Sequence, residues 1–319
     1  MSEMPILSVI VPCYNEEECV QSTTKRLLEV LDELITEKVI SEKSFIFFVD
    51  DGSKDKTWKM IEKEADEKSD RVKGIKFSRN FGNQKAILAG LTESRKYKPD
   101  CFITIDADLQ QDENKIREFV QKYKDGAQIV CGIRNDRNTD GFFKKYSALA
   151  FYKLMNILGV NIKMNHSDYR LIGSDAADAL SQFKETNLFL RGMFQELGFK
   201  QEYVYFDVKP RTIGTSKFTT FSLLTLALSG ITSFSLIPLR LVTCIGFLMS
   251  VVSFIVGLSA IFDHYIRQNT VPGWATIVVC VGVVGGIQIL CLGIIAEYLG
   301  QLFQEAKARP RYIVEKELN

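Results

Sequence analysis

The sequence predicts an α/β protein, with a mostly parallel sheet covered by helices on both faces and a membrane anchor towards its C-terminus. Short apolar runs alternate with amphipathic helical patterns along residues 6–160, as expected for strands connected by helices. Charge is also unevenly distributed, because residues 1–217 are rich in Lys, Glu and Asp whereas residues 218–300 are almost uncharged. The second observation divides the 319-residue chain into a polar domain and an apolar segment.

Each predicted strand is a compact run rich in β-branched and aromatic residues. We expect strands at 7–12, 45–51, 72–77, 101–106 and 127–132. Helical periodicity fills the intervals, at 16–36, 55–68, 83–96 and 112–124. Asp55 is a candidate cap for the second helix. Ligands of such sheets bind beyond the carboxyl ends of the strands, so the polar residues that follow each strand form the candidate site.

The apolar segment contains two long stretches without a charge. Leu241–Phe262 gives 22 residues and Val271–Ala296 gives 26. Because about 20 apolar residues cross a bilayer core, we predict transmembrane helices at 241–262 and 271–299, joined as a hairpin. A pair of buried helices in a soluble protein is the alternative, but adjacent charge-free stretches of this length are rare there. The hydroxyl-rich segment 218–240 is predicted to be an amphipathic helix at the membrane interface.

Charge patterning predicts the orientation and excludes one class of partner. The tail at 300–319 holds Lys307, Arg309, Arg311 and Lys316, whereas the hairpin loop holds only Arg267. The positive-inside rule therefore places both termini in the cytoplasm, in a multi-pass protein of the cell membrane. A net charge of +1 and the lack of a basic run argue against nucleic-acid binding. Seven cysteines without a C-x-x-C pair indicate reduced thiols and no zinc site.

Polar motifs follow four of the predicted strands. They are PCYNEEE (12–18), DDGSKD (50–55), DADLQ (106–110) and GIRNDR (132–137). Each motif alone is also compatible with an ordinary turn, because Asn, Asp and Gly favour turns. Three acidic loops at one edge of a sheet instead indicate a divalent cation, with oxygen ligands from Asp108 and Gln110.

Together with SDYRLI (167–172) and the apolar hairpin, these motifs resemble the polyprenyl-phosphate glycosyltransferases. These are inverting enzymes of GT-A type, related to dolichyl-phosphate mannose synthase. The subgroup most similar to this chain is the bacterial undecaprenyl-phosphate glucosyltransferases with two C-terminal transmembrane helices. The resemblance covers nearly the whole chain and implies a GT-A (Rossmann-like) domain over residues 1–217 on the cytoplasmic side of the membrane.

The resemblance also implies a role for each matching residue. Nucleotide-binding residues would be Pro12, Tyr14, Asn15, Glu16, Asp50, Asp51, Ser53 and Asp106. Asp108 and Gln110 would hold Mg²⁺ or Mn²⁺, while Asp168 and Asp106 would be the catalytic pair. Phosphate and acceptor contacts would come from Arg134, Arg137, Arg211, Ser216 and Lys217. A lipid phosphate is already largely dianionic near neutral pH, so we hypothesise that Asp168 positions the acceptor more than it takes a proton.

The implied reaction transfers one sugar, glucose or GlcNAc, from a UDP-sugar to undecaprenyl phosphate. The alternative hypotheses for the function are a GDP-mannose enzyme, a processive polysaccharide synthase and a catalytically inactive membrane scaffold. No Q-x-x-R-W motif supports the synthase, and the scaffold is disfavoured by the joint presence of Asp106, Asp108, Gln110 and Asp168. The family context implies a flippase and a multi-span transferase as functional partners. Glycines 282, 285, 286 and 293 are compatible with a homo-oligomer in the membrane.

Overall fold

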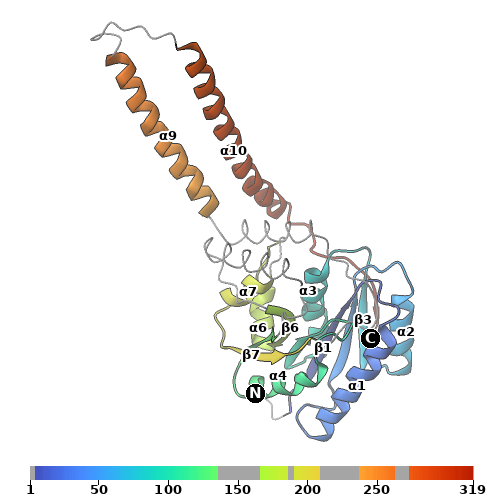
Figure 1. The fold of residues 1–319 in the computed structure, drawn as a ribbon. Coiled ribbons are helices and arrows are strands. Elements are labelled where there is room, and N and C mark those ends of the chain that lie inside the picture. The colour runs from blue at the N-terminus through green and yellow to red at the C-terminus, as the bar shows by residue number, and fades with distance from the viewer. Residues whose placement is uncertain (1–3, 136–165, 186–189, 209–236, 263–272, 319) are drawn as a thin grey trace.

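The computed structural model describes residues 4–135, 166–185, 190–208, 237–262 and 273–318, and is drawn in Figure 1. Within these residues an eight-stranded sheet has the order β7-β5-β6-β4-β1-β2-β3-β8. The strands are β1 Leu7–Cys13, β2 Phe45–Asp50, β3 Val72–Phe77, β4 Cys101–Thr104, β5 Ile129–Arg134, β6 His166–Gly173, β7 Gln201–Phe206 and β8 Val314–Leu318. Only β6 and β8 run antiparallel to their neighbours, which confirms the predicted mostly parallel sheet.

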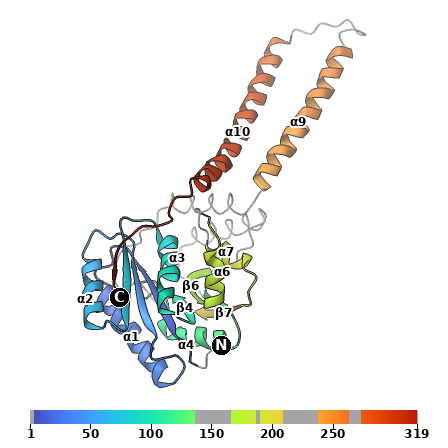
Figure 2. The same cartoon turned by 180° about the vertical axis from the view of Figure 1, so that it is seen from behind.

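Helices cover both faces of the sheet, as Figure 2 shows from behind. The helices of the α/β domain are α1 Val20–Thr36, α2 Thr57–Glu67, α3 Asn83–Glu93, α4 Ile116–Lys124, α6 Ser174–Ser181 and α7 Leu190–Glu196. One buried cluster packs α1, α2 and α4 against one face, and a second packs α3, α6 and α7 against the other. The split follows the strand period of two, because Val9 and Val11 join the first cluster while Ile10 joins the second.

The predicted strands at 45–51 and 72–77 lie within one residue of β2 and β3, but the strand predicted at 101–106 ends early. Ile105 still donates its N–H to the carbonyl of Ile10 at 3.0 Å, so the pairing with β1 continues for one residue. The next N–H, that of Asp106, donates instead to a side chain, Gln111 Oε1, at 3.0 Å. Asp106 therefore begins the loop and does not end the strand.

Strand β6 contains the SDYRLI motif, for which the sequence pattern predicts no element. It lies between β4 and β5 and pairs antiparallel with both, with an irregularity in its register near Cys131. Because β6 runs opposite to β4, its first residues lie at the edge where β4 ends. This reversal brings a motif far along the chain to the carboxyl edge of the parallel strands.

Two long helices project from the α/β domain and lie alongside each other in both views (Figures 1 and 2). They are α9 Ile237–Phe262 and α10 Trp274–Ala306. Among the described residues, one helical segment, Val283–Ala306, is long and apolar enough to cross a membrane, so the predicted two-span hairpin is not confirmed. Large apolar side chains are nevertheless exposed on both helices: Phe247 is 73% exposed and Ile289 72%.

The helix boundaries differ from those predicted. Helix α9 includes Pro238 and Arg240, which we expected to separate an interfacial segment from a span beginning at Leu241. Proline is tolerated in the first turn of a helix, because its missing N–H would have no partner there. Residues 218–236 of the predicted interfacial helix lie outside the described residues. Helix α10 also continues to Ala306, beyond the predicted end at 299.

The residues predicted to be a tail return to the sheet. Strand β8 pairs antiparallel with β3, starting with Val314 opposite Phe77. Immediately before it, the Tyr312 ring stacks on Phe77 with centroids 5.2 Å apart, and its hydroxyl donates to Glu93 Oε1 at 2.8 Å. We call residues 307–318 the C-terminal strap. Because it reaches the sheet at the last residue of β3, the chain arrives from α10 at the carboxyl edge of the parallel strands.

Tyr312→Ala is expected to lower the free energy of unfolding of the α/β domain by about 2 kcal/mol, because it removes a stacked ring and leaves a gap beside Phe77. The measurement is denaturant unfolding of the purified protein in detergent. Tyr205→Ala is the matched control, since Tyr205 lies on β7 and is 53% exposed. Its expected effect is within about 0.5 kcal/mol. Equal effects of the two substitutions would show that the strap is not part of the fold.

Candidate active site

The loops that follow β1 and β2 are joined by hydrogen bonds. The N–H of Asn15 donates to the Ser53 hydroxyl at 2.9 Å, and Asn15 Oδ1 accepts from the N–H of Lys54 at 2.9 Å. The N–H of Glu16 donates to the Thr57 hydroxyl, also at 2.9 Å. Asn15 has a φ of 52°, in the left-handed region that Asn adopts more readily than most side chains. These hydrogen bonds bring three predicted nucleotide-binding residues, Asn15, Glu16 and Ser53, together in two neighbouring loops.

Asp50 and Asp51 are adjacent in sequence but have different environments. Asp50, fully buried at the end of β2, accepts from the N–H of Ser53 through Oδ1 at 3.0 Å, while its Oδ2 has no hydrogen-bond partner in the structure. Asp51 accepts from the N–H groups of Phe81 and Gly82, at 2.6 and 2.9 Å. Burial raises the pKa of both carboxyls, and these hydrogen bonds oppose the rise. Asp51 therefore holds the loop after β3, whereas Asp50 has a buried oxygen that lacks a protein partner.

Asp51→Asn is expected to destabilise the protein by about 1 to 3 kcal/mol, because an amide offers one acceptor oxygen to the two N–H groups of Phe81 and Gly82. Thermal unfolding of the ligand-free protein measures this. Asp66→Asn, at an exposed position on α2, serves as the control and should change stability by no more than about 0.5 kcal/mol. A melting temperature unchanged in Asp51→Asn would contradict the assignment of Asp51 to the loop.

The DADLQ loop follows β4 and is held by local contacts. Leu109 has a φ of 49°, and the N–H of Gln110 donates to Asp108 Oδ1 at 3.2 Å, so the chain folds back over the Asp108 carboxylate. The carbonyl of Ala107 accepts from the hydroxyl of Thr23 on α1, at 2.6 Å. These contacts place the predicted metal ligands Asp108 and Gln110 in one short turn against the start of α1.

Asp106 and Asp168 lie at the same edge of the sheet. Thr104, the last residue of β4, pairs with Arg170 of β6. Its hydroxyl donates to the carbonyl of Asp168 and also contacts that of Arg170 at 3.3 Å. Asp106 follows the end of β4 by two residues, and Asp168 precedes Arg170 by two residues at the start of β6, so both lie at this edge. The structure thus brings together the two residues predicted as the catalytic pair.

The other predicted residues fall into three groups. Pro12 lies in β1 opposite Val49, and Tyr14 follows β1, so both are at the edge described above. Arg134 is exposed at the end of β5, which β6 separates from β4. Four predicted phosphate contacts, namely Arg137, Arg211, Ser216 and Lys217, lie outside the described residues.

The loops after β1 and β4 are also close to each other. The thiol of Cys19, at the start of α1, has its pKa raised to about 11 by burial, and the nearby carboxylates of Glu16 and Asp108 contribute to the rise. Three acidic loops, after β1, β2 and β4, are therefore neighbours at the carboxyl edge, as the sequence predicts.

Asp108 and Gln110 fit a divalent cation that takes its remaining ligands from the substrate and from water. Among the residues that the structure describes, no group of three or more His, Cys, Asp or Glu side chains is arranged to hold a metal. Asp108 and Gln110 supply one carboxylate and one amide oxygen from a single turn. Mg²⁺ is commonly bound by one or two carboxylates together with substrate phosphates and water, so these residues fit an ion completed by a diphosphate.

Two residues near this edge were missed by the sequence analysis. Lys85, in the first turn of α3, has its pKa lowered by burial and by the adjacent Arg79, while Asp51 opposes the shift. Gln111, only 2% exposed, contacts Asp106 through both ends of its amide. The run RNFGNQK, which leads into α3, contains the sequence signal for Lys85, because its glycine marks a turn at this edge. In the structure this glycine, Gly82, has a φ of 99°. Gln111 follows the DADLQ motif directly and has no signal of its own.

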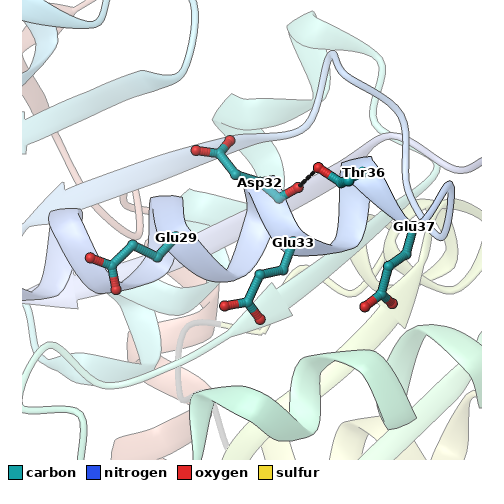
Figure 3. A pocket seen from close by; sticks show the side chains of 5 residues that line it. All are labelled: Glu29, Asp32, Glu33, Thr36 and Glu37. Atoms are coloured by element: carbon teal, nitrogen blue, oxygen red, sulfur yellow. Dashed lines mark hydrogen bonds between the residues drawn. The ribbon is translucent and has the colours of Figure 1, made fainter.

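A shallow hollow on the outer side of α1 lies away from this edge (Figure 3). It is lined by Glu29, Asp32, Glu33, Thr36 and Glu37. Three of its carboxylates form ion pairs with arginines, and the Thr36 hydroxyl donates to the carbonyl of Asp32 at 2.8 Å. The hollow is a charged helix surface and contains none of the predicted site residues.

Comparison with known proteins agrees with the placement of these loops. The model of a family described as glycosyl transferase family 2 matches residues 8–180, which is more than half of the chain. The chain belongs to glycosyl transferase family 2. The matched range runs from β1 to α6, and so includes the acidic loops and the start of β6. As a member of this family the protein is a glycosyltransferase, which confirms the predicted class of enzyme.

Several family 2 relatives match along nearly their whole length. An uncharacterized glycosyltransferase, YkoT of Bacillus subtilis, is 45% identical over 98% of this chain and 92% of its own. The prophage bactoprenol glucosyl transferase homolog of Escherichia coli K12 is 37% identical over 97% and 98%. The bactoprenol glucosyl transferase of Shigella phage SfX is 36% identical over 97% and 98%. The resemblance to polyprenyl-phosphate glycosyltransferases is thus confirmed at the level of the family.

Solved structures are more distant from this family 2 member. Glucosyl-3-phosphoglycerate synthase of Mycobacterium tuberculosis, in complex with Mn²⁺ and UDP, has a TM-score of 0.46 at 15% identity, over 72% of this chain and 78% of its own. Mannosyltransferase PcManGT of Pyrobaculum calidifontis, in complex with GDP-Man and Mn²⁺, has a TM-score of 0.45 at 14% identity, over 96% and 88%. At these values the likeness identifies no substrate for this chain.

Proposed function

We propose that this glycosyltransferase carries out metal-dependent, inverting transfer of a single sugar from a UDP-sugar to undecaprenyl phosphate at the cytoplasmic face of the membrane. Glucose and GlcNAc are the favoured sugars. The product is a lipid-linked monosaccharide for modification of a cell-envelope glycan. The observation that carries the proposal is the shared location of the acidic loops and of the C-terminal strap that follows α10. The acidic loops lie at the carboxyl edge of the parallel strands, and the strap reaches the sheet at the same edge, where β8 begins opposite Phe77.

This location suits a reaction between a soluble donor and a lipid acceptor. The phosphate of a polyprenyl lipid lies at headgroup depth, so its sugar donor must be held close to the membrane. Exposed apolar side chains along α9 and α10 favour burial in lipid, because a soluble protein rarely leaves such a large apolar surface in water. We therefore retain the two-span anchor, with the α/β domain on the cytoplasmic side, as part of the proposal.

The carboxylates that follow the strands would bind the metal, the donor and the acceptor. Asp108 and Gln110 would hold Mg²⁺ or Mn²⁺, which when bound offsets the charge that grows on a departing diphosphate. Asp106 would bind hydroxyl groups of the ribose or sugar, and Asp168 would orient the acceptor phosphate beside it. Asp50 Oδ2, which has no protein partner, is suited to accept an N–H from uracil. Arg134 and the predicted Arg137, Arg211, Ser216 and Lys217 would offset repulsion between two anionic substrates.

The names of the relatives support the acceptor. Proteins named bactoprenol glucosyl transferase match along nearly the whole chain, including the apolar helices that follow the family 2 domain. With a polyprenyl acceptor, those helices would hold the α/β domain at the membrane where the acceptor phosphate lies. A lipid-linked sugar made inside the cell must reach the outer face before use, so a flippase and a multi-span transferase are proposed as functional partners. Homo-oligomerisation through the glycines of α10 is also proposed.

The deciding experiment is a panel of nucleotide sugars tested with purified protein and undecaprenyl phosphate, with and without EDTA. Mass spectrometry of the lipid product should show the gain of one hexose or one N-acetylhexosamine from the UDP-sugar. Product should be lost with EDTA and recovered with excess Mn²⁺. The anomeric coupling in the proton NMR spectrum of the intact lipid-linked sugar distinguishes inversion from retention.

Each alternative has its own outcome in this assay. Transfer from GDP-mannose alone would replace the UDP-sugar assignment, and products that carry many sugars would indicate a processive synthase. Absence of lipid product with every donor, while UDP still binds, would favour a catalytically inactive scaffold.

A further inference from the structure

Gln111 differs from the other polar side chains near the site because it contacts one residue through both ends of its amide. Its Oε1 accepts from the N–H of Asp106 at 3.0 Å, and its Nε2 donates to Asp106 Oδ2 at 2.7 Å. The orientation of the amide is fixed by chemistry, because a backbone N–H only donates and a carboxylate only accepts. The two contacts therefore fix the position of the Asp106 backbone and the direction of its side chain together.

The same amide reaches the start of β6. Gln111 Nε2 lies 3.4 Å from the hydroxyl oxygen of Ser167, which also accepts from the N–H of Tyr169 at 3.2 Å. Ser167 and Tyr169 are the neighbours of Asp168 in the chain. Gln111 and Ser167 are each only 2% exposed, so water does not compete for these hydrogen bonds. One buried side chain thus connects the loop that carries Asp106 with the strand that carries Asp168.

We propose that Gln111 is a positioning residue for sugar transfer, which holds the Asp106 carboxylate in place and fixes its distance from Asp168. The inference rests on the proposed function of these two aspartates. Gln111 itself contacts neither substrate nor metal in this account. Its effect comes from keeping a carboxylate in the geometry that hydrogen bonds to hydroxyl groups require, where a displacement of about 1 Å can cost about 100-fold in rate.

The test is a double-mutant cycle with Gln111→Met and Asp106→Asn. Methionine keeps the volume and flexibility of glutamine but can neither donate to nor accept from Asp106. Gln111→Met is expected to lower kcat/KM for the nucleotide sugar about 100-fold. In the Asp106→Asn background it is expected to lower kcat/KM by less than about threefold, because the carboxylate that Gln111 positions is already gone. A purely structural role would instead give effects that multiply.

The matched control is Gln121→Met. Gln121 also donates to a carboxylate, Asp125 Oδ1 at 3.0 Å, but on the exposed surface at the end of α4. It is expected to leave kcat/KM within about twofold of the wild type. Melting temperatures of all variants separate a loss of fold from a loss of position.

A second measurement keeps this inference separate from the proposed function. Calorimetry measures the binding of UDP in the presence of Mn²⁺ and without any acceptor. The proteins measured are the wild type, the two single variants and the double variant of the same cycle. If the wild type binds UDP but forms no lipid product, the proposed reaction fails while Gln111 is still judged by UDP affinity. The inference is overturned if Gln111→Met binds and transfers within threefold of the wild type, or if the two substitutions act independently in both measurements.

Discussion

Asp108→Ala is expected to reduce sugar transfer by about 100- to 1,000-fold, the largest effect of any single substitution considered for this protein. Asp108 supplies the carboxylate of the proposed cation site, and alanine leaves only the amide of Gln110 in that turn. The affinity for Mn²⁺ in the presence of UDP should fall together with the rate. Initial rates with the UDP-sugar that serves as donor, measured across a series of Mn²⁺ concentrations, report both quantities.

Asp112→Asn is the matched control for this substitution. Asp112 lies in the same loop, but its carboxylate accepts from the N–H of Asn114 at 3.2 Å as a cap, and asparagine caps equally well. Its rate should remain within about twofold of the wild type. A rate for Asp108→Ala that is also unchanged would remove the metal site from Asp108 and, with it, the proposed stabilisation of the diphosphate.

Asp50→Asn is expected to have opposite effects on stability and on nucleotide binding. The ligand-free protein should become more stable at pH 7 by about 1 kcal/mol, because the substitution removes a carboxylate whose charged form is disfavoured by burial. Affinity for UDP should fall about 10-fold or more, because a charged acceptor for the uracil N–H is replaced by a neutral one. Chemical denaturation and calorimetry measure the two effects.

The pH dependence of stability supplies an independent check. The pKa of Asp50 is raised in the folded state, so the folded protein holds this proton more tightly than the unfolded chain does. The contribution of Asp50 to stability is therefore greatest in acid and is lost as pH rises through the folded pKa. The stability advantage of Asp50→Asn should accordingly shrink as pH falls through the raised folded pKa, and it should be smallest below about 4, the ordinary value for aspartate. An advantage that is constant with pH would show that Asp50 is not the cause.

The sequence was most informative where local pattern and function coincide. Runs such as FIFFVD and VKGIKF are buried strands with turn residues after them, so they predict both an element and the site beyond its end. The acidic loops after β1, β2 and β4 were predicted together for the same reason, since parallel strands present their carboxyl ends at one edge. The two long apolar stretches likewise predicted helices, although their ends were misplaced.

The sequence was least informative where partners come from distant parts of the chain. SDYRLI has no pattern that reveals a reversed strand between β4 and β5, and it pairs with residues that precede it by more than thirty positions. The C-terminal strap resembled a charged tail, because an edge strand with alternating charges has no strong apolar signal. Asp50 and Asp51 also looked equivalent, and only their partners distinguish a loop anchor from an unsatisfied acceptor.

By itself, the sequence determined the class of fold, the edge of the sheet at which the candidate site residues lie and the family of the enzyme. These follow from strand and helix periods and from short motifs, whose physical meaning is local. Only the tertiary structure decided that Asp168 lies at the same edge of the sheet as Asp106, that Gln111 connects the loop of Asp106 with the start of β6, and that the strap brings the chain from α10 to the same edge. Those relations depend on register and hydrogen bonds between residues far apart in sequence, and no local pattern records them.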